Sequence, residues 1–263
     1  MKIVVAIKQV PSRDSLLKVA SSGRQIDEAD LSFEINEPDA YALEAGLQLK
    51  EAHGGEVVVL CAGPDRAGQT IREALAKGAD RAIHIETEEG WAADPLELAR
   101  IMAKALTSEK PDLILTGLQS DDLGYGQTGV VLAEVMGLPH ATIIMSIEAS
   151  GGSIAPAAPA IKVKRELEDG WFQHVEMPLP ALLTIQSGAT KLRYATLMGI
   201  KKAKSKEVKR LAAADLAGGS TPSISIQRIY MPEKSKHSQI FDGPPKEAAA
   251  QLVEKLRFEA RVI

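Results

Sequence analysis

The chain of 263 residues is long enough to bury a sizeable core, and we expect one large α/β domain with appendages rather than two small domains. Its net charge of −4 at pH 7 argues against nucleic acid or an anionic membrane as the main partner, because both require a strong positive field. Its single cysteine, Cys61, excludes a disulfide framework and a multi-cysteine metal site, and it fits a reducing compartment.

The amino terminus enters an apolar run at Ile3–Ile7, with no apolar or Arg/Ser-rich leader before it. No stretch of 18 apolar residues occurs in the sequence, so we expect no membrane insertion and a cytoplasmic location. The five histidines, at positions 53, 84, 140, 174 and 237, form no HxxxH or HExxH pair. The sequence therefore predicts no metal site.

Apolar runs alternate with helical patterns through the first half of the chain. Strands are expected at Ile3–Ile7, Val57–Leu60, Ala82–Ile85 and Leu113–Leu115, and helices at Tyr41–His53, Ala67–Lys77 and Pro95–Thr107. Helix-start signals agree: Asn36-Glu37-Pro38-Asp39 precedes the first helix, and Pro95 opens the third. This alternation predicts βαβ units and a parallel sheet.

The segment Asp112–Pro139 is the most informative part of the chain. An apolar strand leads into a glycine-rich loop, Gly117–Gly129, and a helical pattern follows at Val130–Met136. Helix amino ends carry unpaired N–H groups, so this loop lets a phosphate approach the backbone, and Gln127 and Thr128 would add donors. The loop matches neither a P-loop nor GxGxxG. An adenine nucleotide held without a catalytic lysine and a plain connecting loop both remain open.

Three segments follow strands and should meet at one edge of the sheet: Lys8–Pro11, Cys61–Pro64 and Gly117–Thr128. The pair Asp121-Asp122 in the third segment could serve acid–base chemistry or magnesium binding. More economically, one of these carboxylates caps the loop or accepts hydrogen bonds from an adenine or ribose.

From about residue 141 the pattern changes to antiparallel hairpins. Thr142–Glu148, Ser153 and Ile161–Leu167 are separated by glycine turns, and Ala181–Ile185 gives a final apolar strand. Charged and apolar residues alternate along 162–170. This alternation fits a solvent-exposed hairpin with cross-strand ion pairs, or an interface in which Arg165 and Glu166 meet charges on a partner.

After Gln186 the chain loses core-like periodicity. Tyr194, Leu197, Met198 and Ile200 are apolar residues with no evident core to join, and a lysine run follows at positions 201–206. The run is either a solvated face or a docking site for an acidic partner. A linker-like stretch, a strand-like run at Ile224–Tyr230 and a helix at Pro245–Phe258 then form an arm expected to pack on something else.

Several of these motifs together resemble the β subunit of electron transfer flavoprotein over essentially the whole chain. The matching blocks are VVAIKQVP, INEPDAYALEAGLQLKE, AGPDRAGQTIREALAKGADRAIHI, LILTGLQSDDLGYGQTG, VKRELEDGWFQHVEMPLPALLTI and RYATLMGIKKAKSK. The resemblance implies a parallel-sheet nucleotide-binding domain of the adenine nucleotide hydrolase-like, HUP type, with an antiparallel extension and a C-terminal arm. The implied parts are this domain at 1–188, a partner recognition loop at 189–208, and an arm at 209–263 that packs on the α subunit.

The resemblance also implies a function and its residues. The chain would be half of a heterodimeric electron carrier with no substrate-converting chemistry of its own: FAD lies mainly on the α subunit, and AMP is buried in the β subunit. Arg165 and Glu166 would contact the α subunit near the flavin. The implied AMP-binding residues are Ala6, Lys8, Asn36, Cys61, Ala62, Asp122, Leu123, Gly126, Gln127 and Thr128.

The resemblance further implies electron donors of the acyl-CoA dehydrogenase type and a quinone reductase or similar acceptor. Leu197 would anchor in a hydrophobic pocket of the donor. The other expected docking residues are Arg193, Tyr194, Lys201, Lys202 and Lys204.

The sequence departs from the family pattern in the docking loop and in the nucleotide loop. Thr190-Lys191-Leu192 stands where an Asn-Glu-Pro is usual, and Gly124-Tyr125-Gly126 replaces more polar residues. A bifurcating branch of the family holds a second FAD in this subunit and usually shows an FAGADT-like segment, where this chain reads EGWAADPLELAR. AMP is therefore favoured over FAD. The alternatives are a bifurcating subunit and a stand-alone nucleotide-binding protein of the stress-protein or ATP-pyrophosphatase type.

Overall fold

The computed structural model describes residues 1–88, 94–149, 160–218, 223–232 and 238–263. These residues fall into two units, Met1–Ile229 and Tyr230–Ile263. The strands are β1 Lys2–Ile7, β2 Gln9–Pro11, β3 Phe33–Ile35, β4 Glu56–Gly63, β5 Arg81–Glu86, β6 Leu113–Gly117, β7 His140–Ala149, β8 Ala160–Glu166, β9 Phe172–Pro178, β10 Ala181–Ile185 and β11 Val208–Ala212. The helices are α1 Glu37–His53, α2 Gly68–Lys77, α3 Pro95–Leu106, α4 Thr128–Met136, α5 Leu197–Ala203, α6 Ala213–Ala217 and α7 Pro245–Phe258.

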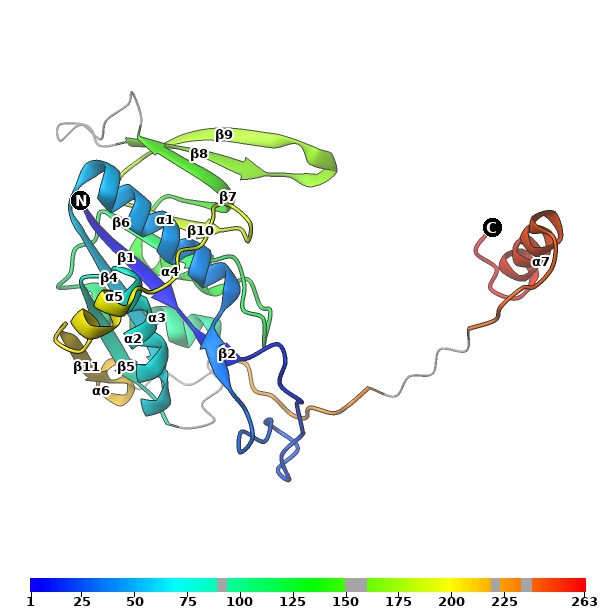
Figure 1. The fold of residues 1–263 in the computed structure, drawn as a ribbon, viewed down its shortest axis with the longest axis horizontal. Coiled ribbons are helices and arrows are strands. Elements are labelled where there is room, and N and C mark those ends of the chain that lie inside the picture. Colours follow the sequence, from blue (N-terminus) through cyan, green and yellow to red (C-terminus); the bar gives the residue numbers. More distant parts are fainter. Residues whose placement is uncertain (89–93, 150–159, 219–222, 233–237) are drawn as a thin grey trace. The chain divides into compact units, whose positions relative to one another are not determined.

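Within the described residues, a nine-stranded sheet runs through the first unit in the order β11-β5-β4-β1-β6-β10-β7-β8-β9 (Figure 1). The strands from β11 to β7 are parallel to their neighbours, whereas β8 and β9 continue the sheet antiparallel. A short antiparallel pair, β2 and β3, stands apart. The predicted α/β class, parallel sheet and antiparallel extension are confirmed.

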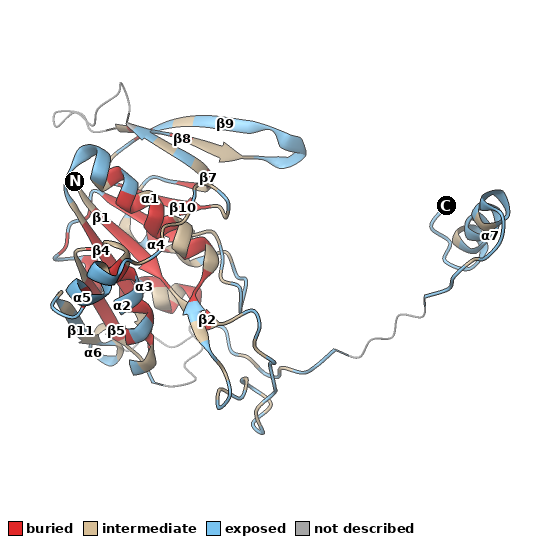
Figure 2. Cartoon of the chain, in the orientation of Figure 1, coloured by how far each residue is buried: buried red, intermediate tan, exposed pale blue. Residues whose placement is uncertain are grey.

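The central strands of the sheet, β1, β4, β6 and β10, are mostly apolar and are buried on both faces, whereas β8, β9 and β11 are more exposed (Figure 2). Side chains alternate between two cores: Ile3, Val5 and Ile7 of β1 join the core under α1, α2 and α5, whereas Val4 and Ala6 join the core under α3, α4 and α6. The helices of the first unit, α1 to α6, thus lie in two layers with the sheet between them.

The order of the strands reverses beside β1. From β1 the chain adds β4 and β5 on one side, and β6 then pairs with β1 on the other side. The chain leaving β1 leads to α1 on one face, whereas the chain leaving β6 leads to α4 on the opposite face. A crevice at the carboxyl ends of such strands is the usual ligand position in open parallel sheets.

The second half of the chain differs in part from the sequence prediction. The antiparallel pairing of β7 with β8 is confirmed, but Gly151-Gly152 and Ser153 lie outside the described residues. Val208–Ala212, expected to lie beyond the core, instead forms β11 and pairs with β5. Residues 224–230 carry no strand among the described residues; Ile229 donates one backbone hydrogen bond to Gly23, over 2.8 Å. A single backbone hydrogen bond to a loop is not enough to form a β-strand.

The second unit contains α7, whose bounds coincide with the predicted helix. Every residue of α7 is at least partly exposed, including Leu252, Val253 and Phe258. Lys255 and Glu259 form an ion pair one turn apart. An isolated helix of this length is marginal in water, so its apolar side chains need a surface to cover them.

Candidate functional site at the carboxyl edge of the sheet

The loop between β6 and α4 is held against the start of α1 by Asn36. The Asn36 side chain donates from Nδ2 to the Gln119 carbonyl oxygen over 2.9 Å, and its Oδ1 accepts the Asp121 backbone N–H over 2.9 Å. Asn36 is buried, and its own backbone N–H donates to the Lys8 carbonyl. Asn36 was expected to line a nucleotide pocket; in the structure its side chain fixes the loop that would form one.

Asp39 ties the ends of β1 and β6 together. Its Oδ2 accepts the Lys8 backbone N–H over 2.8 Å, and its Oδ1 accepts the Gly117 N–H over 2.9 Å. Burial raises the pKa of Asp39 to about 7, although both N–H groups oppose that shift. A Cβ on Gly117 would lie 2.3 Å from Asp39 Oδ1, so only glycine allows this approach. Sequence reasoning read Asp39 only as a helix-start acid and missed this role.

The two neighbouring acids of the loop are bound by different cations. Lys8 Nζ lies 2.7 Å from Asp122 Oδ1, and Arg13 lies 3.2 Å from Asp121 Oδ2. Burial would raise the pKa of Asp122, but the Lys8 ammonium outweighs it and holds that pKa below its usual range. Asp122 Oδ1 also accepts the N–H of Leu123 over 2.7 Å. Both carboxylates therefore contribute to the conformation of the loop.

The start of α4 follows directly after this loop. Gly124 and Gly126 both have positive φ, 64° and 62°, and the helix then begins at Thr128. A Cβ on Gly129 would meet Thr116 Oγ1 and Thr184 Cγ2 at 2.7 Å, so the first turn packs closely on β6 and β10. Within the described residues no side chain caps this helix. A phosphate oxygen fits such uncapped N–H groups.

Ala6, Ala62 and Cys61 end strands β1 and β4, but their side chains do not share one face. Ala6 and Ala62 contact the core under α3 and α4, whereas Cys61 belongs to the core under α1 and α2. Burial raises the pKa of the Cys61 thiol to about 12, and Asp39 adds to the shift. Cys61 is therefore a protonated core side chain on the face of the sheet opposite to Ala6 and Ala62.

The expected docking residues Tyr194 and Leu197 are exposed, with 92% and 82% of their surface accessible. Arg193 differs, since its guanidinium binds Glu44 and Glu51 of α1. Lys201, Lys202 and Lys204 are exposed at the end of α5. The apolar residues of this segment were expected to have no core to join; in the structure α5 packs on α2, with Ala203 buried.

Arg165 and Glu166 lie at the end of β8, before the turn to β9. Arg165 Nη2 donates to Thr142 over 3.1 Å, and Glu166 accepts from Gln186 over 3.3 Å. The Arg165 Nε is buried without a hydrogen-bond partner among the residues described. Trp171 and Phe172 at the same hairpin end are exposed, and Lys164 lies 3.8 Å above the Phe172 ring. The hairpin end thus combines charged and aromatic side chains.

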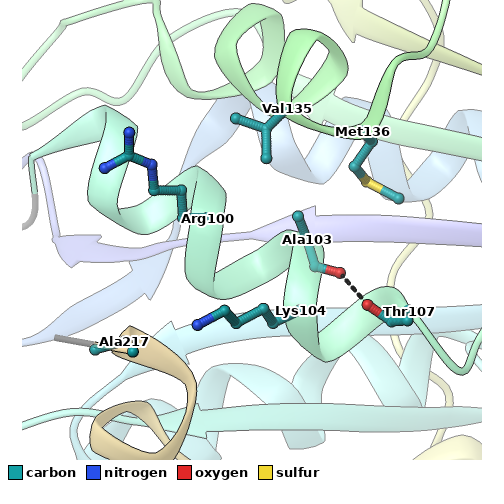
Figure 3. Close-up of a pocket in the computed structure, with 8 residues that line it drawn as sticks. Arg100, Ala103, Lys104, Thr107, Val135, Met136 and Ala217 are labelled. Atoms are coloured by element: carbon teal, nitrogen blue, oxygen red, sulfur yellow. Dashed lines mark hydrogen bonds between the residues drawn. The ribbon is translucent and has the colours of Figure 1, made fainter. Parts of the chain in front are cut away.

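A separate surface pocket lies between α3, α4 and α6 (Figure 3). Its volume is about 550 Å³, and Arg100 and Lys104 of α3 border it together with Val135 and Met136 of α4. Val135 and Met136 are the last two residues of α4, so the pocket lies at the opposite end of that helix from the loop that starts it.

Two kinds of feature are absent from the described residues. Among the described residues, no group of three or more His, Cys, Asp or Glu side chains is placed to hold a metal ion. In the same part of the chain, no helix has the length and apolar character needed to cross a membrane.

Comparison with known proteins identifies the family. The model of the family described as "Electron transfer flavoprotein domain" matches residues 24–216. The electron transfer flavoprotein subunit beta of Methylophilus methylotrophus is 35% identical over 262 residues, with 97% of each chain covered. The proteins of that name from Bradyrhizobium diazoefficiens and Bacillus subtilis are 35% and 32% identical, and both alignments cover all of each chain. Because these matches run from end to end, the chain belongs to the electron transfer flavoprotein family, in its β-subunit branch.

Proposed function

We propose that this chain is one half of a heterodimeric electron carrier and that it binds AMP at the carboxyl edge of the sheet. The observation that carries the proposal is the loop from Gly117 to Gln127, which Asn36 and Asp39 pin in place and which opens on the uncapped start of α4. Gln127 and Thr128 would supply donors for the phosphate, and the small side chains of Ala6 and Ala62 would lie beside the base. Leu123 and Gly126 complete the loop around it.

AMP would be a structural ligand rather than a substrate. Lys8 forms an ion pair with Asp122, Arg13 forms one with Asp121, and the Cys61 thiol is protonated in the core. A group engaged in this way is poorly placed to abstract or deliver a proton during a reaction. These contacts support a carrier subunit in which the nucleotide stabilises the fold.

FAD, held mainly by an α subunit, would supply the electron-carrying chemistry of the complex. The β8–β9 hairpin end would meet that subunit close to the flavin, with Arg165 and Glu166 in contact. The exposed rings of Trp171 and Phe172 at this hairpin end support the placement, because large apolar side chains that gather on a surface are typical of interfaces. Replacing Glu166 by Gln should then shift the flavin reduction potential or weaken flavin retention.

Donors of the acyl-CoA dehydrogenase type would dock on the exposed side chains of Tyr194 and Leu197. The lysines at 201, 202 and 204 would steer the encounter, so their neutralisation should slow association at low salt and matter little at high salt. A quinone reductase or similar acceptor would complete the chain of transfer, in the cytoplasm.

The decisive experiment is co-expression with the α subunit, purification, and extraction of the bound nucleotides. We expect about one AMP and one FAD per heterodimer. Two FAD and no AMP would overturn the AMP assignment in favour of the bifurcating branch. Purification without a yellow partner would favour a stand-alone nucleotide-binding protein.

A pair of glycine variants localises the site. Gly126→Ala and Gly137→Ala place a Cβ at similar positive φ values, 62° and 65°, at opposite ends of α4. Neither Cβ would lie closer than 3.8 Å to another residue, so the backbone strain is matched. Only Gly126→Ala should lower the AMP content. Equal loss in both variants would argue against the loop as the AMP site.

A further inference from the structure

We propose that Arg193 is a positioning residue that fixes the segment from which Leu197 is presented to the electron donor, rather than a residue that touches the donor. This inference rests on the proposed docking role of Leu197. The docking segment is defined here as residues 193–206.

The Arg193 guanidinium is bound by two carboxylates of α1. Its Nε and Nη2 lie 2.8 and 3.0 Å from the two oxygens of Glu44, and its Nη1 and Nη2 lie 2.6 and 3.1 Å from those of Glu51. The Arg193 backbone N–H also reaches Glu44, over 3.3 Å. These contacts engage all three guanidinium nitrogens.

The contact with Glu44 is more than a surface ion pair, because Glu44 is only 4% exposed. Burial would raise the pKa of Glu44, but the hydrogen bonds from Arg193 and Gln48 outweigh it and hold that pKa below its usual range. Bidentate, charge-assisted pairs of this kind fix both distance and orientation. A carboxylate that is buried beneath Arg193 has little surface to offer a docking protein.

The far end of the docking segment is fastened to α2. A Cβ on Gly199 would lie 2.2 Å from the Ala76 carbonyl oxygen, so the backbone of α5 sits directly on the end of α2. Thr196 caps α5 by accepting the Gly199 N–H over 3.0 Å. Lys206 Nζ donates to the Leu75 carbonyl in the last turn of α2 and to the Ala79 carbonyl just beyond that helix.

Between the contact of Arg193 with α1 and the contact of α5 with α2 lie three largely exposed residues, Tyr194, Leu197 and Met198. Exposed apolar side chains on a fixed backbone are already arranged for insertion into a pocket, so less conformational freedom is lost on binding. Releasing Arg193 would restore that freedom without removing any contact between Leu197 and the donor. Arg193 thus acts on affinity through Leu197.

The test uses the complete heterodimer and an acyl-CoA dehydrogenase that reduces it, with the Michaelis constant and kcat measured separately. Arg193→Gln and Glu44→Gln should each raise the Michaelis constant for the carrier by about 3- to 10-fold, the effect of freeing one or two side chains, with kcat nearly unchanged. The result for Glu44→Gln is the more telling, since that side chain is buried.

Combination with Leu197→Ala separates this inference from the docking role itself. If Arg193 acts through Leu197, then Arg193→Gln has little further effect in the Leu197→Ala background. The inference is overturned if the Michaelis constant of the double variant rises by the product of the two single-variant increases. It is also overturned if Leu197→Ala raises the constant and Arg193→Gln leaves it unchanged. An unchanged constant in Leu197→Ala overturns the docking role instead.

Arg81→Gln is the matched control. Arg81 binds the carboxylates of Glu56 and Glu109 in the same two-partner manner and is comparably covered, at 19% against 28% side-chain exposure for Arg193. Its loss should lower stability while leaving the Michaelis constant for the carrier unchanged. A similar rise in that constant would show general destabilisation and overturn the inference.

Discussion

Asp39 is the residue on which the carboxyl edge of the sheet depends. Its carboxylate joins α1 to β1 and β6 through two backbone N–H groups, and its folded pKa of about 7 lies well above the value of 3.8 for an unperturbed aspartate. The folded protein therefore binds a proton that the unfolded chain has released, over a window from about pH 4 to 7. Stability from this group is greatest below that window and falls as the pH rises through it.

We expect Asp39→Asn to remove this pH dependence. Each pKa unit corresponds to about 1.4 kcal/mol, so the parent should lose roughly 3 to 5 kcal/mol relative to the variant between pH 4 and 8. Urea unfolding of both proteins at four pH values in this range measures the difference. The acids held by Arg193, such as Glu44, have lowered pKa values, so the stability that they contribute is lost as the pH falls, the direction opposite to that of Asp39. A constant difference between parent and variant would contradict the assignment.

Cys61 is expected to be structural. Its buried thiol stays protonated at neutral pH, so it should resist alkylation until the protein unfolds. Cys61→Ala should cost about 1 to 2 kcal/mol of unfolding free energy, the usual scale for trimming a small buried side chain. Flavin reduction by the donor should be nearly intact. Loss of electron transfer in a folded Cys61→Ala protein would refute a purely structural role.

At the scale of the element, the end of β6 lies so close to the start of α1 that no side chain fits at position 117. Gly117→Ala should cost about 1 to 3 kcal/mol, since its Cβ would collide with Asp39 and Pro38 and displace the loop. The amount of AMP that purifies with the Gly117→Ala protein should fall as well.

Gly68→Ala is the control for the Gly117 variant, because its Cβ would meet only Arg72 at 3.8 Å in the first turn of α2. Alanine also favours a helix, so this variant should be unchanged or slightly more stable. Thermal unfolding and nucleotide extraction compare the two. Equal AMP loss in both would mean that the β6 end does not control the nucleotide site.

At the scale of the whole molecule, the two units carry separate roles. Met1–Ile229 contains the sheet and both cores, whereas Tyr230–Ile263 leaves its apolar side chains exposed. We expect truncation after Ile229 to leave the unfolding temperature of the isolated chain nearly unchanged while weakening association with the α subunit by more than about tenfold. Calorimetry and titration with the α subunit test this. Unimpaired association would refute the arm as a subunit contact.

The sequence predicted much of the first unit because that information is local. Apolar runs and helical spacing located β1, β4, β5, β6 and the helices between them, and the strand ends pointed to one edge of the sheet. β11 was missed because Val208–Ala212 is a short, half-polar strand at the edge, where pairing with β5 rather than its own pattern decides its structure.

The sequence by itself determined the alternation of strands and helices, the glycine loop before α4 and the family likeness, since each depends on residues close together in the chain or on their order. Only the tertiary structure decided that Asp39 joins two strands, that Cys61 faces away from Ala6, and that Arg193 binds α1 rather than standing free. Those contacts join residues far apart in sequence, 149 positions in the case of Arg193 and Glu44. The order of strands in the sheet brings them together, and no local periodicity encodes that order.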